Sequence, residues 1–93
     1  MRIRFYIDPA TAEPHIYGHN VTEDEAAFVL MFPGEDRQGE NGARVALGQT
    51  VTGRYLKVVY IPDEELESYF IITAYELCGK PLSAYRRRRR KGN

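Results

Sequence analysis

Cysteine, tryptophan and long apolar segments are scarce or missing in this chain. Its 93 residues include one cysteine and no tryptophan. Because the lone Cys78 cannot pair within the chain, a disulfide scaffold is excluded and a reducing compartment is favoured. No stretch approaches the roughly eighteen apolar residues of a membrane span, and the opening "MRIRFYIDP" lacks the apolar core of a secretion signal. These absences predict a soluble, cytoplasmic protein with a single core and no membrane association.

The motifs of common catalytic and cofactor sites are also missing. There is no Walker loop, dinucleotide-binding glycine pattern, GxSxG elbow or CxxC pair. His15 and His19 have the four-residue spacing of metal ligands on a helix, but Gly18 lies between them and no third ligand is near. We therefore expect no metal and no cofactor, and the pattern does not support hydrolysis through a nucleophilic side chain.

The net charge is zero, yet the charges are unevenly distributed along the chain. All thirteen acidic residues lie at or before Glu76, whereas six of the thirteen basic residues form the run at 86–91. Residues 1–85 thus carry seven basic and thirteen acidic side chains, a net charge of −6, which the run balances. We divide the chain into a domain over residues 1–85 and a basic arm over residues 86–93. Such an arm is typical of nucleic-acid contact, but it can equally be solvated or fold back onto the acidic domain.

The spacing of apolar residues predicts a strand and two helices in the first half of the chain. Residues 2–7 alternate basic and apolar side chains as a half-buried strand does, and residues 8–17 fit a short helix. A clearer helix begins at Thr22, where Glu25 completes a capping box. The polar, glycine-rich residues 33–43 that follow it are typical of an exposed loop.

The second half of the chain is rich in β-forming residues. Three strands are expected over about residues 43–51, 54–61 and 68–75, and their short connections predict an antiparallel meander. Leu82 and Tyr85 then fit a last helical turn, which the arginines either extend or leave frayed in solvent. The order β-α-α-β-β-β-α predicts an α+β fold, a small antiparallel sheet with the helices packed on one face.

Tyrosines and arginines on the expected sheet are candidates for ligand contact. Most tyrosines on strands are half-buried packing residues, but single-stranded nucleic acid is also held by stacking on aromatic rings and by cations at the phosphates. Tyr85, directly before the arginine run, fits that combination. The residues predicted to bind nucleic acid are Tyr75, Tyr85, Arg86, Arg87, Arg88, Arg89, Arg90 and Lys91.

Three stretches occur in a recognisable order, "HIYGHNVTEDEAAFVL", "ALGQTVTGRYLKVVYI" and "FIITAYE", followed by a tyrosine and a basic C-terminus. Together, over roughly residues 15–90, they resemble the BrnT-like toxins and related domains of the RelE-like superfamily. The resemblance implies a RelE-like fold and a ribonuclease toxin of a type II toxin–antitoxin pair, which inhibits translation by metal-free cleavage of RNA. It also implies a small DNA-binding antitoxin as the protein partner.

The same resemblance indicates candidate catalytic residues. His19 matches a histidine just before the family's helix, Arg54 lies in its G-R-Y motif, and Arg44 matches a basic residue that opens the preceding strand. Tyr75 stands where the family usually has arginine. Metal-free cleavage requires a base for the ribose 2′-hydroxyl, an acid for the leaving oxygen and a cation at the phosphate. We predict His19 or Glu76 as base or acid, with Arg54 and Arg44 at the phosphate.

Two other functions fit the same residues. A catalytically silent domain of this fold would bind nucleic acid through Tyr85 and the arginine run, with an affinity that falls steeply with salt. Alternatively, the run would bind an acidic protein partner, including the acidic domain of a second copy in a homodimer. Loss of such a complex on deletion of residues 86–91 would distinguish this last function.

Overall fold

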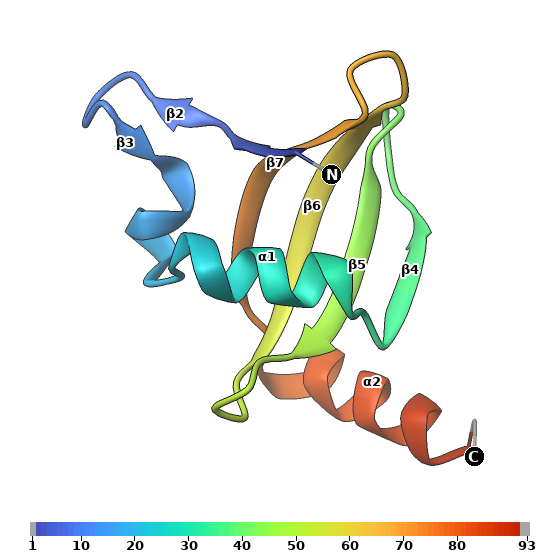
Figure 1. Cartoon of the computed structure of the whole chain (residues 1–93). Coiled ribbons are helices and arrows are strands. Elements are labelled where there is room, and N and C mark those ends of the chain that lie inside the picture. The colour runs from blue at the N-terminus through green and yellow to red at the C-terminus, as the bar shows by residue number, and fades with distance from the viewer. Residues whose placement is uncertain (1, 92–93) are drawn as a thin grey trace.

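The computed structural model describes residues 2–91 of the chain (Figure 1). Its elements are, in chain order, β1 (Arg2–Phe5), β2 (Ile7–Asp8), β3 (Glu13–Pro14), the 3₁₀-helix η1 (His15–His19), α1 (Glu23–Met31), β4 (Glu35–Gln38), β5 (Arg44–Gln49), β6 (Tyr55–Asp63), β7 (Ser68–Glu76) and α2 (Gly79–Lys91). Within the described range, no helix is both long and apolar enough to cross a membrane. Residues 92 and 93, the end of the predicted arm, lie outside that range.

Five strands form one sheet in the order β1-β7-β6-β5-β4, which with the helices gives a compact α+β domain. β5, β6 and β7 are antiparallel neighbours, which confirms the predicted meander. β1, however, pairs with β7 in parallel, so the sheet is mixed where a purely antiparallel one was predicted. The parallel pair joins Arg2 to Ser68, and a pairing between such distant segments leaves no local signal in the sequence.

The second edge of the sheet lies where the sequence predicts a loop. Within residues 33–43, β4 pairs antiparallel with β5, so the loop prediction is wrong there. The side chains of β4 are mostly exposed. With few apolar contacts, this edge strand is stabilised mainly by its backbone pairing with β5. Such a strand lacks the apolar alternation on which a prediction depends.

The helix predicted over residues 8–17 is also wrong. This segment forms the β2–β3 hairpin and then η1. Asp8 accepts a hydrogen bond from the Ala10 backbone N–H at 2.9 Å, and therefore stabilises a tight turn where a helix N-cap was expected. Pro14 explains the outcome, because the residue before a proline is driven out of the helical region.

The two helices pack against opposite faces of the sheet, so the prediction that they share one face is wrong. On the face covered by α1, which crosses the strands in Figure 1, lie Ile16, Val29, Ala46, Leu56, Val58 and Ile71. On the other, here called the α2 face, lie Val45, Leu47, Leu77, Leu82 and Tyr85. β5 shows the reason. Val45, Ala46 and Leu47 point alternately to the two faces and all are buried, as a strand covered on both sides requires.

α2 includes residues 86–91 of the predicted arm, since the helix continues without a break from residue 79 through residue 91. Its anchor is Tyr85, which is only 4% exposed and packs near Tyr55 at a ring separation of 6.0 Å. Gly34, in the segment between α1 and β4, makes this packing possible because it has no side chain. A Cβ at this position would overlap the Tyr85 hydroxyl.

We therefore expect Gly34→Ala to weaken the attachment of α2. Because the buried Tyr85 ring has little room to move, the added methyl group should lower the free energy of unfolding by about 1–3 kcal/mol. Urea unfolding measures this change. Gly18→Ala is the matched control, because a Cβ there meets nothing within 4 Å, and its effect should stay within about 0.5 kcal/mol. Equal effects of the two substitutions would contradict this account of Gly34.

Candidate nucleic-acid interface

His19 is held at the edge of the sheet beside β7. β1 pairs only with the first part of β7, so the rest of that edge of β7 has no strand partner in the described sheet. The 3₁₀-helix η1 packs against β7. There the His19 ring lies 5.9 Å from the Tyr75 ring and 5.1 Å from the His15 ring, centroid to centroid. His19 is exposed, and Tyr75 is 36% exposed. The imidazole is thus open to solvent and next to an accessible aromatic ring.

Arg54 lies near this histidine, but its guanidinium group is engaged by the protein itself. Its Nη1 donates to both carboxylate oxygens of Glu25, at 2.8 and 2.9 Å, and to the Asn20 carbonyl at 2.9 Å. Its Nη2 donates to Glu76 at 3.2 Å. Two carboxylates therefore compensate the charge of Arg54. Because Asn20 directly follows His19, the guanidinium fixes the backbone that carries the imidazole, which makes Arg54 a positioning residue.

Arg44 is far from this group. It begins β5 and pairs in register with Tyr60, whereas Gln49, at the other end of β5, pairs with Tyr55. Five residues of strand separate Arg44 from Gln49, or roughly 17 Å. Arg44 donates to Asp36 at 3.0 Å, and the Tyr60 hydroxyl donates to the same carboxylate at 2.6 Å. Burial, with a smaller contribution from Asp36, raises the pKa of Tyr60 to about 12. The structure does not bring Arg44 together with His19.

Three cations lie over aromatic rings on the α2 face, a feature the sequence analysis missed. Arg4 lies over Phe70 at 5.1 Å, Lys57 over Tyr75 at 5.7 Å and Arg86 over Tyr55 at 5.8 Å, each measured to the ring centroid. We call these six residues the cation–aromatic row. Lys57 and Tyr75 are direct cross-strand partners of β6 and β7. The strand alternation of "RYLKVVY" was the available signal, because it places Tyr55 and Lys57 on the same side of β6.

The row connects the histidine to the arginine run. His19 contacts Tyr75, which lies opposite Lys57, and Lys57 is two residues from Tyr55 on the same side of β6. Arg86 of α2 then lies over Tyr55. A continuous series of neighbouring side chains therefore joins the imidazole to the run along the α2 face. The Arg54 guanidinium, by contrast, is directed toward Glu25 of α1.

The cations of the α2 face are largely without carboxylate partners. Within residues 2–91, ion pairs engage Arg37, Arg44, Arg54 and Arg88. In that part of the chain no ion pair engages Arg2, Arg4, Lys57, Arg86, Arg87 or Arg90. The acidic residues cluster elsewhere, notably in the first turn of α1 and in the turn between β6 and β7. The tertiary structure thus separates unpaired positive charge from most of the negative charge.

The predicted arm residues have different environments. Tyr85 is buried, so its ring packs in the core and is closed to a stacking base in this structure. Arg88 donates to both oxygens of Glu35, at 2.5 and 2.9 Å, and chiefly this contact lowers the pKa of Glu35. Arg89 donates to the Gly34 carbonyl at 2.9 Å. The run therefore folds back onto the domain in part, while Arg86, Arg87 and Arg90 are exposed on α2.

No protein-family model, curated protein or solved structure matches this chain. The class of protein that the fold and this surface define is a compact α+β domain with a mixed five-stranded sheet and one cationic, aromatic face. The resemblance to BrnT-like toxins stays a prediction.

The Glu25 carboxylate gives this region a dependence on pH. A hydrogen bond from the Thr22 backbone N–H and the contact with Arg54 lower the pKa of Glu25, while partial burial acts in the opposite direction. Because the folded-state value is below the unfolded one, Glu25 stabilises the fold above the ordinary glutamate pKa of about 4.3. It loses that contribution as pH falls through the lowered value.

We therefore expect Glu25→Gln to destabilise the protein at pH 7 and to have a much smaller effect near pH 3. Urea unfolding at both values measures the difference. The control is Glu65→Gln, in the exposed turn between β6 and β7, which should change stability little at either pH. An equally large loss of stability at pH 3 would show that the ionised form of the Glu25 carboxylate is not what stabilises the fold.

Proposed function

We propose that this protein binds single-stranded RNA along the α2 face. The observation that carries the proposal is the cation–aromatic row, in which three rings are each paired with a cation that no carboxylate neutralises within the described residues. Single-stranded nucleic acids are held by this combination, since bases stack on rings while cations contact the phosphates. Tyr75 offers the most accessible ring of the sheet.

The distribution of charge favours one binding orientation. Phosphates are repelled by the acidic first turn of α1, which carries Glu23, Asp24 and Glu25. They are attracted to the α2 face, where Lys57 and the exposed arginines of α2 lie. A chain of zero net charge can therefore present a cationic surface to RNA, because its acidic residues lie mostly on other surfaces.

We expect Lys57→Gln and Tyr75→Ala each to weaken binding of a ten-nucleotide single-stranded RNA about tenfold, because one removes a phosphate contact and the other a stacking ring. Fluorescence anisotropy over a series of salt concentrations measures both. Lys57→Gln should also reduce the slope of log affinity against log salt by about 0.7, and Tyr75→Ala should leave that slope unchanged. Tyr17→Ala is the matched control, since Tyr17 is slightly more exposed than Tyr75 and its hydroxyl donates to Glu23 away from the row. Equal losses for Tyr17 and Tyr75 would refute the proposal, and tighter binding of a duplex would exclude single-stranded RNA as the preferred ligand.

We further propose that RNA bound beside His19 is cleaved, as the resemblance to ribonuclease toxins implies. The specific observation in its favour is that an exposed imidazole and the Lys57 ammonium group both lie near the Tyr75 ring, at 5.9 Å and 5.7 Å from its centroid. His19 would take the proton from a ribose 2′-hydroxyl, and the 2′ oxygen would bond to phosphorus while the bond to the 5′ oxygen breaks. Lys57 would stabilise the charge on the phosphorane. Solvent would protonate the 5′ oxygen, leaving a 2′,3′-cyclic phosphate and a 5′-hydroxyl.

In this proposal Lys57 takes the role that the sequence analysis gave to Arg54 and Arg44. Glu76 bonds Arg54 and so supports the position of His19, rather than acting as the acid. A toxin role further implies a neighbouring antitoxin protein as partner. If the purified protein binds RNA and leaves it intact, the catalytically silent binding domain is the correct alternative.

A further inference from the structure

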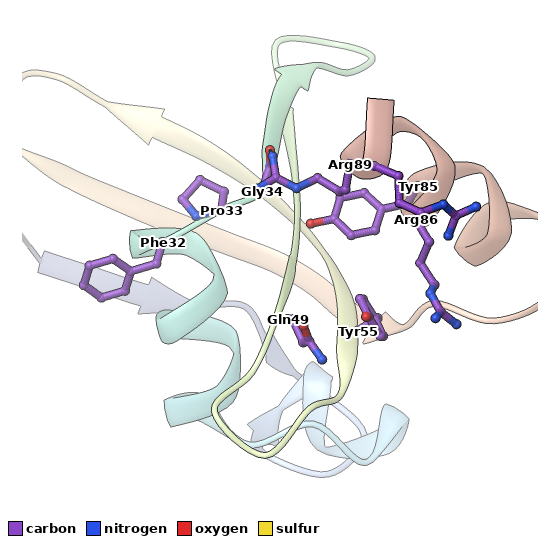
Figure 2. Close-up of a pocket in the computed structure, with 9 residues that line it drawn as sticks. Phe32, Pro33, Gly34, Gln49, Tyr55, Tyr85, Arg86 and Arg89 are labelled. Carbon is purple, nitrogen blue, oxygen red and sulfur yellow. The ribbon is translucent and has the colours of Figure 1, made fainter. Parts of the chain in front are cut away.

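A cleft of about 440 Å³ lies between α2 and the segment that connects α1 to β4 (Figure 2). Its lining includes Gln49, Tyr55, Tyr85 and three arginines of α2, Arg86, Arg89 and Arg90. The volume falls within the range of small-ligand sites. Among the residues that the structure describes, no acidic side chain lines the cleft. It therefore differs from an ordinary surface depression in being both aromatic and strongly cationic.

The wall of the cleft is held in place by two contacts to one residue. The Arg89 guanidinium reaches across to the Gly34 carbonyl, where Nη1 donates at 2.9 Å (Figure 2). The buried Tyr85 ring directs its hydroxyl toward the same glycine. Arg89 and Tyr85 thus hold the wall of the cleft against Gly34, and the exposed side chains of Arg86 and Arg90 complete its lining.

Arg86 and Arg90 are positioned to share an anion. They are four residues apart on α2, so their Cβ atoms are about 6 Å apart on one side of the helix. Two like charges at this spacing on a helix repel each other. Within the described residues no carboxylate pairs with either guanidinium. A phosphate between them would replace this repulsion with charge-assisted hydrogen bonds.

The opposite side of the cleft fits a planar group. The half-buried Tyr55 ring lies under the Arg86 guanidinium, and Gln49, the last residue of β5, is the cross-strand partner of Tyr55. The Gln49 side-chain amide donates to the Gly53 carbonyl at 3.2 Å, which fixes it near the ring. An aromatic ring and a fixed amide are the groups that stack on a nucleobase and hydrogen-bond its edge. An inorganic anion or an acidic peptide would use the arginines and leave this side empty.

We propose that the cleft is a nucleotide subsite of the RNA-binding surface, with the phosphate between Arg86 and Arg90 and the base against Tyr55 and Gln49. This inference rests on the proposed RNA-binding function and adds the place where one nucleotide is held. The subsite lies next to Tyr55, so it continues the cation–aromatic row away from His19.

The test is an NMR titration of the full chain with adenosine 5′-monophosphate, adenosine, inorganic phosphate and a tetraglutamate peptide. We expect the nucleotide to shift the backbone amides of Gly34, Gln49 and Tyr55, and to bind about tenfold more tightly than adenosine or phosphate. Arg86→Gln and Arg90→Gln should each weaken nucleotide binding about tenfold. Arg87→Gln, which removes the same charge from a residue outside the cleft lining, should weaken it less than about twofold.

Three results would overturn the subsite: phosphate binding as tightly as the nucleotide, stronger binding of the peptide, or an equal effect of Arg87→Gln. Parallel RNA titrations separate this inference from the proposed function. If RNA binding requires Lys57 and Tyr75 while the nucleotide leaves the three amides unshifted, the subsite is wrong and the RNA surface stands. If the nucleotide occupies the cleft while Lys57→Gln and Tyr75→Ala leave RNA affinity unchanged, the subsite is correct and the proposed RNA-binding surface is wrong.

Discussion

Replacing His19 with asparagine is expected to reduce RNA cleavage about 10²- to 10⁴-fold, because the substitution removes the group that we propose takes the 2′-hydroxyl proton. The asparagine has a similar size, so binding should change little. The measurements are single-turnover cleavage of a labelled RNA, with identification of the 2′,3′-cyclic phosphate, and binding of the same RNA at 4 °C. Expression of the wild-type chain should arrest growth of the host, and expression of the variant should not.

The matched control is His15→Phe. His15 occupies the same short helix, and a phenyl ring at this position keeps the ring contact with His19. Cleavage by this variant should remain within about threefold of the wild type, as expected where no proton transfer is lost. Because His15→Phe preserves this ring packing, equal losses for the two substitutions would show that the His15 imidazole is also required, and would refute proton transfer by His19 alone. Wild-type protein that binds RNA without cleaving it would refute the catalytic proposal and leave the binding proposal standing.

Replacing Arg86, Arg87 and Arg90 together with glutamine is expected to lower the affinity for single-stranded RNA about a hundredfold at low salt. Each arginine is exposed and lacks an ion pair within the described residues, so each can neutralise a phosphate. The salt slope should fall by about 2, since each phosphate contact contributes about 0.7 for a single strand. Anisotropy titrations between low and moderate salt measure both quantities.

This triple substitution is a sharper test than deletion of the whole run. Deletion would also remove Arg88 and Arg89, which bond Glu35 and Gly34 and hold α2 on the domain. Arg44→Gln is the control, because Arg44 pairs with Asp36 and lies far from the cation–aromatic row. It should change stability little, because exposed ion pairs contribute little, and should leave RNA affinity unchanged. A triple variant with unaltered affinity and salt slope would exclude α2 from the interface. If the variant instead lost a self-associated state, the run would serve a protein contact.

The sequence predicted the elements whose signals are local. The capping box at Thr22 and Glu25 forms as expected, with hydrogen bonds of 3.0 and 3.1 Å in the two directions, because both partners lie within four residues. The meander of β5, β6 and β7 was also predictable, since short turns leave consecutive strands few other partners. The parallel pairing of β1 and the presence of the polar edge strand β4 could not be predicted, because neither leaves a local pattern in the sequence.

The sequence by itself determined the number and order of the charged residues in the chain. Only the tertiary structure decided which of these charges are left without an ion-pair partner. Thirteen acidic and thirteen basic residues are visible in the chain, and six of the basic residues lie together at 86–91, after the last acidic residue. Folding then engages Arg54 with Glu25 and Glu76, and leaves Lys57 over Tyr75 without a carboxylate partner in the described chain. The reason is geometric. Ion pairs form between groups within a few ångströms, and the packing of α1 on the sheet together with the register of the strands, rather than separation along the chain, determines which groups are that close.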